Sequence, residues 1–94
     1  MIRIALCDDD LHFLQLLHQT VDQWFTERQI VSTCTDYFSA RALQDALETS
    51  GFDIFFLDIE MPEMGGMELA RQIREALPDS VIIFLTSHDE FAPD

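Results

Sequence analysis

The sequence predicts an α/β protein built on a doubly wound parallel sheet, and three observations support this class. Short apolar runs alternate with amphipathic stretches along the 94 residues, as in successive strand–helix units. The third and fourth runs are apolar at nearly every position, as expected of strands that helices cover on both faces. Gly and Pro number only three each, too few for the many turns of an all-β fold. Because crossovers between parallel strands are right-handed, these units leave few possible topologies.

The first two strands and the helix between them fill the first third of the chain. Residues 2–7 form an apolar run that predicts a strand. Residues 30–35 are short and rich in β-branched side chains, which predicts the second strand. Between them, residues 10–28 are predicted to form a helix, because apolar residues recur there at helical spacing: Leu14, Leu17, Val21, Trp24 and Phe25.

The next unit begins with a short helix. Ser39 is a typical N-terminal cap, and the helix after it would bury Leu43, Ala46 and Leu47 before ending at Ser50-Gly51. Residues 53–57 are almost continuously apolar and predict a central strand.

Residues 61–66 form a loop, because they hold a proline and a pair of glycines. Residues 67–77 return to helical spacing until Pro78 stops the helix, and residues 80–85 predict a fourth strand. Residues 86–94 are polar and form no complete element.

The charge of the chain excludes some functions. Asp and Glu outnumber Lys and Arg by 18 to 5, so the formal net charge is -13. Such a surface repels phosphate backbones, and we expect no nucleic acid binding by this segment. The N-terminus lacks the apolar core of a signal peptide, and no apolar run approaches the roughly 20 residues that span a bilayer. We therefore expect a cytoplasmic protein without membrane contact.

Acidic and hydroxyl side chains follow three of the predicted strands. Asp8, Asp9 and Asp10 come after the first strand, Asp58 after the third, and Thr86-Ser87 after the fourth. The carboxyl ends of parallel strands meet at one edge of a sheet, and ligands bind there at the point where the strand order reverses. The sequence thus predicts one rim at which carboxylates and hydroxyls gather.

The chemistry of this rim follows from its charge. Neighbouring carboxylates raise one another's pKa, and a hard divalent cation such as Mg²⁺ relieves the repulsion. A carboxylate held beside Mg²⁺ can attack phosphorus and form an aspartyl phosphate, while a hydroxyl donates to a phosphoryl oxygen. Asp10 alone is better explained as the cap of the following helix. Asp8, Asp9 and Asp58 together are better explained as a site, because separate strand ends agree.

Three motifs of the chain resemble the CheY-like receiver domains of bacterial two-component response regulators. They are Ile-Ala-Leu-Cys-Asp-Asp-Asp at 4–10, Phe-Asp-Ile-Phe-Phe-Leu-Asp-Ile-Glu-Met-Pro-Glu-Met-Gly-Gly at 52–66, and Ile-Ile-Phe-Leu-Thr-Ser at 82–87. The middle motif is highly specific, and the resemblance covers essentially the whole chain. It implies a flavodoxin-like sheet of order 2-1-3-4-5, of which residues 1–94 would supply 2-1-3-4.

The resemblance also implies a role for each site residue. Asp58 would accept a phosphoryl group from a sensor histidine kinase, in a signalling module that is not an enzyme. Mg²⁺ would be held by Asp8, Asp9 and Asp58, with Asp9 as a direct ligand and Glu60 offering its backbone carbonyl. Thr86 would be the switch hydroxyl at the phosphoryl group, with Ser87 beside it.

The chain departs from the family pattern at its C-terminal end. The family places a lysine at the end of a fifth strand, and this chain contains arginines but no lysine. We therefore expect residues 1–94 to be a single receiver domain, C-terminally truncated before the fifth strand and the last helix. The fourth strand, residues 81–85, would then be an apolar sheet edge, and we expect homo-oligomers through this strand and the fourth-helix region that follows.

Two short segments, Cys-Asp-Asp-Asp at 7–10 and Thr-Ser-His-Asp-Glu-Phe-Ala at 86–92, look most similar to receivers that are attached to LytTR-type DNA-binding domains, which would make the parent protein a transcriptional regulator. Two alternatives to a receiver that takes up phosphate stay open. The first is a pseudo-receiver that acts only through interactions with other proteins, and the second is an enzyme. A haloacid-dehalogenase-like phosphatase also uses an Asp after a strand, but Asp58-Ile59-Glu60 only loosely matches its Asp-x-Asp motif.

Overall fold

Four strands and three helices alternate along residues 1–85, the part of the chain that this computed structural model describes. In chain order they are β1 (Ile2–Cys7), α1 (Leu11–Glu27), β2 (Ser32–Tyr37), α2 (Ala40–Ala46), β3 (Ile54–Asp58), α3 (Gly66–Ala76) and β4 (Val81–Leu85). The strands form one parallel sheet of order β2-β1-β3-β4. The predicted fold class and strand order are therefore confirmed.

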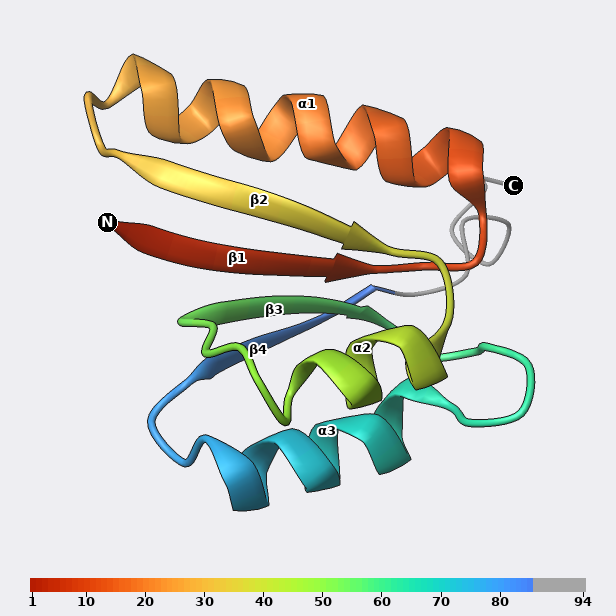
Figure 1. The fold of residues 1–94 in the computed structure, drawn as a ribbon. Coiled ribbons are helices and arrows are strands. Elements are labelled where there is room, and N and C mark those ends of the chain that lie inside the picture. Colours follow the sequence, from red (N-terminus) through yellow and green to blue (C-terminus); the bar gives the residue numbers. More distant parts are fainter. Residues whose placement is uncertain (86–94) are drawn as a thin grey trace.

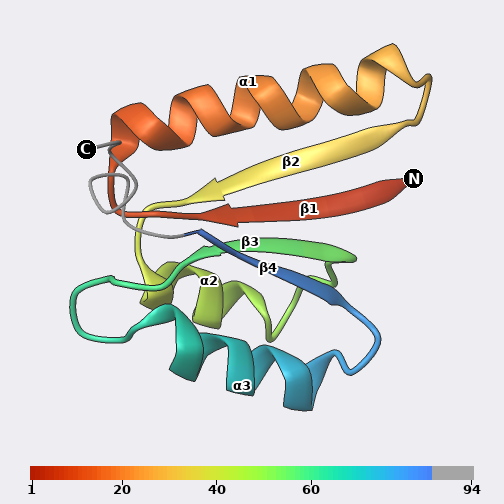
Figure 2. The same ribbon diagram turned by 180° about the vertical axis from the view of Figure 1, so that it is seen from behind.

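The helices lie on both faces of the sheet. α1 covers one face, and α2 and α3 lie side by side on the other, as seen in Figure 1 and from behind in Figure 2. The chain passes from β1 outward to β2 and then returns to β3 on the other side of β1. The strand order thus reverses between β1 and β3, and Cys7 pairs with Leu57 at their carboxyl ends. The residues that follow these two strands must lie close together.

α1 shows how sequence pattern and capping define a helix. The Asp10 side chain caps it by accepting a hydrogen bond from the Phe13 amide, at 3.1 Å. Leu14, Val21 and Phe25 are buried against the sheet at helical spacing. Within residues 1–85, neither this 17-residue helix nor any other is both long enough and apolar enough to cross a membrane.

The boundaries of β1 were predicted correctly, whereas those of β2 were wrong by two residues. Ile30 was expected to begin the strand, but its amide donates back to the Phe25 carbonyl at 3.0 Å. Gln29 adopts a left-handed conformation with φ of 59°. These residues complete the end of α1, so the strand begins only at Ser32. α2 likewise ends at Ala46, before the predicted stop at Ser50-Gly51.

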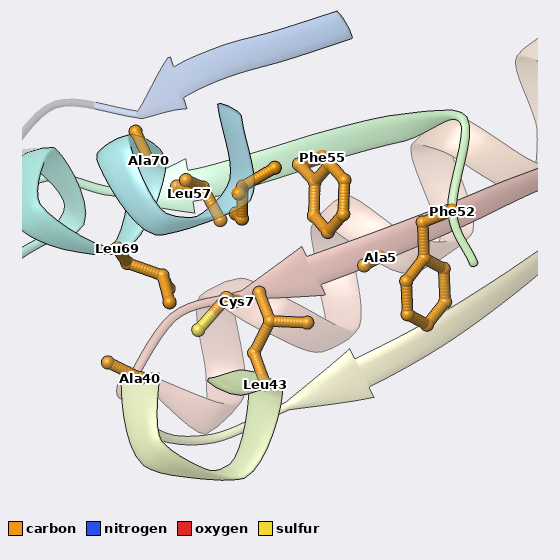
Figure 3. Packing of buried hydrophobic residues seen from close by; sticks show 10 residues of the cluster. Ala5, Cys7, Ala40, Leu43, Phe52, Phe55, Leu57, Leu69 and Ala70 are labelled. Atoms are coloured by element: carbon orange, nitrogen blue, oxygen red, sulfur yellow. The ribbon is translucent and has the colours of Figure 1, made fainter. Parts of the chain in front are cut away.

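Two apolar cores stabilise the fold, one on each face of the sheet. Figure 3 shows the larger one, in which β1 and β3 pack against α2 and α3. Each fully buried large side chain stabilises the fold by about 1.5–3 kcal/mol. The buried residues of this core are Ala5, Cys7, Ala40, Leu43, Phe52, Phe55, Leu57, Leu69, Ala70 and Ile73, and those under α1 are Ile4, Leu6, Leu14, Val21 and Phe25.

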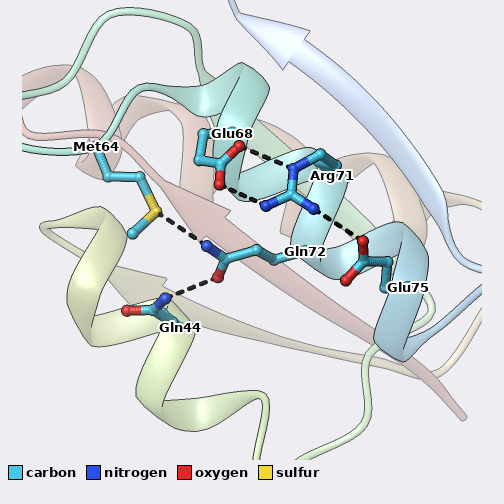
Figure 4. A network of polar contacts seen from close by, with 6 residues as sticks. All are labelled: Gln44, Met64, Glu68, Arg71, Gln72 and Glu75. Carbon is cyan, nitrogen blue, oxygen red and sulfur yellow. Dashed lines mark hydrogen bonds and ion pairs between the residues drawn. The ribbon is translucent and has the colours of Figure 1, made fainter.

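A polar contact joins α2, α3 and the loop after β3. Gln44 on α2 donates to the side-chain oxygen of Gln72 on α3 at 2.7 Å, and Gln72 in turn contacts the Met64 sulfur at 3.9 Å (Figure 4). Met64 belongs to the loop between β3 and α3. The two helices therefore fix the position of a loop that starts beside Asp58.

Candidate functional site

Three carboxylates meet where the strand order reverses. Side-chain oxygens of Asp8, Asp9 and Asp58 all lie within 4.8 Å of one another. Asp8 is 2% exposed and Asp58 is 9% exposed, whereas Asp9 is open to solvent. The structure therefore brings together the three aspartates that the sequence singled out, and it arranges them as two buried carboxylates with one exposed carboxylate beside them.

Backbone hydrogen bonds hold the two buried aspartates. The Asp8 amide donates to the Tyr37 carbonyl at 3.2 Å, and the Asp8 carboxylate accepts from the Asp10 amide at 2.9 Å. Asp58 is the last residue of β3, and its carboxylate accepts from the Glu60 amide at 3.1 Å. Each carboxylate is therefore oriented by the backbone amide two residues further along the chain. Asp10, as predicted, is a helix cap and not a member of the cluster.

The loop after β3 folds closely over the site backbone. The Gly66 amide donates to the Ile59 carbonyl at 2.9 Å, and Gly66 then begins α3. A Cβ atom on Gly66 would meet the Asp58 carbonyl oxygen and would lie only 2.9 Å from the Asp58 carbonyl carbon. Space, and not a left-handed backbone, requires glycine here, because no described glycine has a positive φ. Sequence reasoning identified Gly66 as a turn residue and missed this packing.

The cluster strongly perturbs Asp58. Burial, and after it the charge of Asp8, raises the pKa of Asp58 to about 6, against a partly compensating hydrogen bond from the Glu60 amide. The folded state therefore favours the protonated form of Asp58 more strongly than the unfolded chain does. The stability that this group contributes is present below its ordinary pKa of 3.8 and is lost as the pH rises through about 6. At neutral pH the fold gains from any cation that binds the cluster.

The donors of the cluster fit Mg²⁺. This ion prefers carboxylate and carbonyl oxygens and keeps several waters, and the exposed side of Asp9 leaves room for them. The side chain of Glu60 is exposed and is not part of the carboxylate cluster. Cys7, directly below, is no competing ligand, since burial and the three aspartates raise the pKa of its thiol to about 12.

Two predicted site residues, Thr86 and Ser87, lie outside the described residues, and the predicted hydroxyl side of the site stays a prediction. The structure adds two residues that sequence reasoning did not select. Arg41 and Glu63 face each other across a hollow next to Asp9. No motif paired them, because their proximity depends on how the start of α2 packs against the loop after β3.

Comparison with known proteins agrees with this geometry. Residues 4–93 match the family model described as the response regulator receiver domain. The chain is 34% identical over 71 residues to the DNA-binding transcriptional regulator NtrC of Klebsiella pneumoniae, covering 72% of this chain and 15% of that protein. It is 37% identical over 93 residues to the transcriptional regulatory protein YdfI of Bacillus subtilis, covering 96% and 40%. The chain thus spans less than half the length of these relatives.

A solved structure shows the same likeness. The response regulator protein TrrA from Thermotoga maritima, crystallised with Mg²⁺ and beryllofluoride, superposes with a TM-score of 0.81 at 26% identity. The match covers all of this chain and 76% of that one. TrrA has also been solved in complex with the histidine kinase ThkA, and there the TM-score is 0.72 at 28% identity over the same shares of the two chains.

Proposed function

The chain belongs to the response regulator receiver domain family, and from this premise we propose that Asp58 accepts a phosphoryl group from a sensor histidine kinase. One observation supports this most directly: Asp58 is buried at the end of β3 within 4.8 Å of two further carboxylates. A buried carboxylate in such a group is poorly solvated, and this favours its action as a nucleophile toward phosphorus.

The proposed reaction is a substitution at phosphorus. A carboxylate oxygen of Asp58 forms a bond to phosphorus, while the bond from phosphorus to the kinase's imidazole nitrogen breaks and its electron pair stays on the imidazole. The hydrogen bond from the Glu60 amide holds one Asp58 oxygen and so orients the carboxylate for attack. The chain therefore acts as a phosphoacceptor in signalling and not as an enzyme with a separate substrate.

Asp8, Asp9 and Asp58, with the Glu60 carbonyl, would hold Mg²⁺ in this proposal. When bound, Mg²⁺ supplies positive charge that neutralises the phosphoryl oxygens. The chain's own contribution is orientation: the Asp8 carboxylate is fixed by the Asp10 amide, and Asp9 lies on the open side from which a donor arrives. We propose that Thr86 and Ser87 donate to the phosphoryl oxygens.

Acetyl phosphate, a small phosphodonor, tests the function without knowledge of the kinase. Incubation with acetyl phosphate and Mg²⁺ should add one phosphoryl group to the intact mass, and peptide mapping should place it on Asp58. A chain that binds Mg²⁺ but gains no mass would instead be a pseudo-receiver. Steady hydrolysis of a phosphomonoester would favour the phosphatase alternative.

Mg²⁺ binding should depend on pH between 5 and 7. Protons compete with Mg²⁺ for Asp58, whose pKa is about 6, so the affinity at pH 5 should be about tenfold lower than at pH 7. Calorimetric titration at several pH values measures this. Asp58→Asn should bind more weakly, with an affinity that changes little over the same range. Equal affinities of the unsubstituted chain at pH 5 and 7 would contradict the assignment.

The biological setting is a further part of the proposal. We propose one cytoplasmic receiver module over residues 1–94, whose parent protein regulates transcription through a LytTR-type DNA-binding domain. The sequences at 7–10 and 86–92 support this choice of partner domain. The net charge of -13 disfavours DNA binding by this segment, so DNA contact would come from another part of the parent protein.

We also propose that the 94-residue polypeptide self-associates through β4. Among the described residues, β4 has a strand neighbour only on the β3 side. Its residues Val81, Ile83 and Phe84 are exposed and apolar, and such an edge pairs readily with another chain.

Sedimentation velocity at micromolar concentration should show dimers or larger species, and Ile83→Lys should shift them toward monomer. Leu16→Lys, on the exposed side of α1, is the matched control and should not. Only compact monomer of the unsubstituted chain would contradict this.

A further inference from the structure

Charge opposes the approach of a phosphodonor to this site. Acetyl phosphate and phosphohistidine are anionic, the three aspartates of the cluster are acidic, and the chain has a net charge of -13. Like charges slow association, and a positive side chain near the entrance raises the encounter rate. The chain has five Lys and Arg residues in total, all of them arginines within the described part.

Three of these arginines lie at the opposite end of the sheet. Arg3 is near the start of β1, where its amide and guanidinium contact Asp53. Arg28 follows α1 and stacks on Trp24, with the guanidinium carbon 3.9 Å from the ring centroid. Arg74 donates to backbone carbonyls just after α3, ahead of β4. None of the three is at the carboxyl edge that holds Asp58.

The fourth arginine is already occupied. Arg71, in the middle of α3, donates to both Glu68 carboxylate oxygens at 2.6 and 2.9 Å and to Glu75 at 2.8 Å (Figure 4). Its charge is balanced locally by two carboxylates. Arg41, in the first turn of α2, is therefore the one of these five arginines that is both at the carboxyl edge and not engaged by such a network.

Arg41 shares a hollow with the acidic site. The hollow measures about 370 Å³ and is lined by Asp9, residues 38–41 after β2 and residues 62–64 after β3. Its size suits a small acyl phosphate or an imidazole ring, and it opens next to the exposed aspartate of the cluster. An anion entering here meets the Arg41 guanidinium and Asp9 in the same space.

Arg41 is held away from the site only weakly. Its Nε lies 3.9 Å from a Glu63 carboxylate oxygen, and the two side chains are 72% and 76% exposed. Such an exposed ion pair contributes little stability, so the guanidinium can exchange partners at small cost.

We infer that Arg41 is a positioning residue for the phosphodonor: it draws the anionic donor into the hollow beside Asp9, and Glu63 competes with the donor for it. The inference rests on the proposed phosphoryl transfer to Asp58 and deepens it. It assigns to α2 a cation that acts before transfer, while the acidic cluster acts during transfer.

Rates of phosphorylation by acetyl phosphate test this inference. At low ionic strength and with saturating Mg²⁺, Arg41→Gln should lower the second-order rate constant about three- to fivefold. The deficit should shrink in high salt, because screening removes the attraction. Arg41→Lys should retain most of the rate, and Glu63→Gln should raise it about twofold. Arg28→Gln removes the same charge at the far end of α1 and serves as the control, with a rate close to that of the unsubstituted chain.

A second readout separates steering from folding. Removing Arg41 should weaken beryllofluoride binding in the presence of Mg²⁺ but leave Mg²⁺ affinity equal or slightly higher, since a repelling charge is lost. General damage would lower both affinities. If the unsubstituted chain is phosphorylated while Arg41→Gln matches it at low salt, the inference is overturned and the proposed function stands. A chain that neither reacts with acetyl phosphate nor binds beryllofluoride overturns both.

Discussion

Asp58→Asn should abolish uptake of a phosphoryl group from acetyl phosphate, with a rate at least about a thousandfold below that of the unsubstituted chain. The neutral amide has almost no nucleophilicity toward phosphorus, and the neighbouring carboxylates cannot replace it. Asp8 is oriented by the Asp10 amide and is almost fully buried, while Asp9 lies on the exposed side. Intact-mass measurement over a time course of acetyl phosphate and Mg²⁺ gives the result directly.

The fold of this variant should survive, so the loss can be assigned to chemistry. Burial and Asp8 raise the pKa of Asp58 to about 6, which means that ionisation at pH 7 costs the metal-free fold about 3 kcal/mol. Asn removes that cost and still accepts from the Glu60 amide. Urea unfolding without Mg²⁺ should therefore show Asp58→Asn to be at least as stable as the unsubstituted chain.

Asp10→Asn is the matched control for this experiment. It makes the same chemical change two residues from Asp8, at a carboxylate that caps α1 and lies outside the cluster. Asn is as good a cap as Asp, so both stability and phosphorylation should be retained. A phosphoryl group that still appears on Asp58→Asn would place the acceptor elsewhere and refute the proposed site.

The acidic site could be predicted from sequence because parallel topology converts strand ends into neighbours. Asp8 and Asp58 are 50 residues apart along the chain, yet each follows an apolar run, and adjacent parallel strands bring both to one edge. The cap role of Asp10 was predicted for a similar reason, since the signal lies within one turn of the helix. In both cases the signal is local: an apolar run followed by an acid marks each strand end, and an acid before the helical pattern marks the cap.

Other features depend on how separate segments pack, and sequence patterns do not show this. β2 begins two residues later than predicted because the Ile30 amide donates to the Phe25 carbonyl at the end of α1. A run of β-branched residues does not show whether its first amide will bond to the sheet or to the preceding helix. Arg41 is in the first turn of α2 and Glu63 is in the loop after β3, and their proximity depends on how these two segments pack. The sequence shows that five arginines exist, whereas only the structure shows which one lies beside the aspartates.

Gly66→Ala should be the most damaging small substitution in the loop that follows Asp58. Helix propensity alone favours alanine over glycine by about 1 kcal/mol at a helical position. Here the added Cβ would meet the Asp58 carbonyl oxygen and would lie 2.9 Å from its carbon and 3.0 Å from the Ile59 Cα. These are backbone atoms of β3 and its exit, which cannot rotate away as a side chain would. The clash should therefore win, with a net loss of about 2–3 kcal/mol.

Urea unfolding of Gly66→Ala measures this loss, and Gly51→Ala is the control. The three atoms nearest to a Cβ on Gly51 would all belong to the Arg3 guanidinium, the closest at 3.0 Å, and this flexible group can move. Gly51→Ala should cost less than about 1 kcal/mol. Since relief of the Gly66 clash requires Asp58 or Ile59 to shift, phosphorylation by acetyl phosphate should also slow in the fraction of Gly66→Ala that is folded. A variant with unchanged stability and rate would show that the loop can retreat without moving Asp58, and the close packing at Gly66 would then have no part in orienting the acceptor.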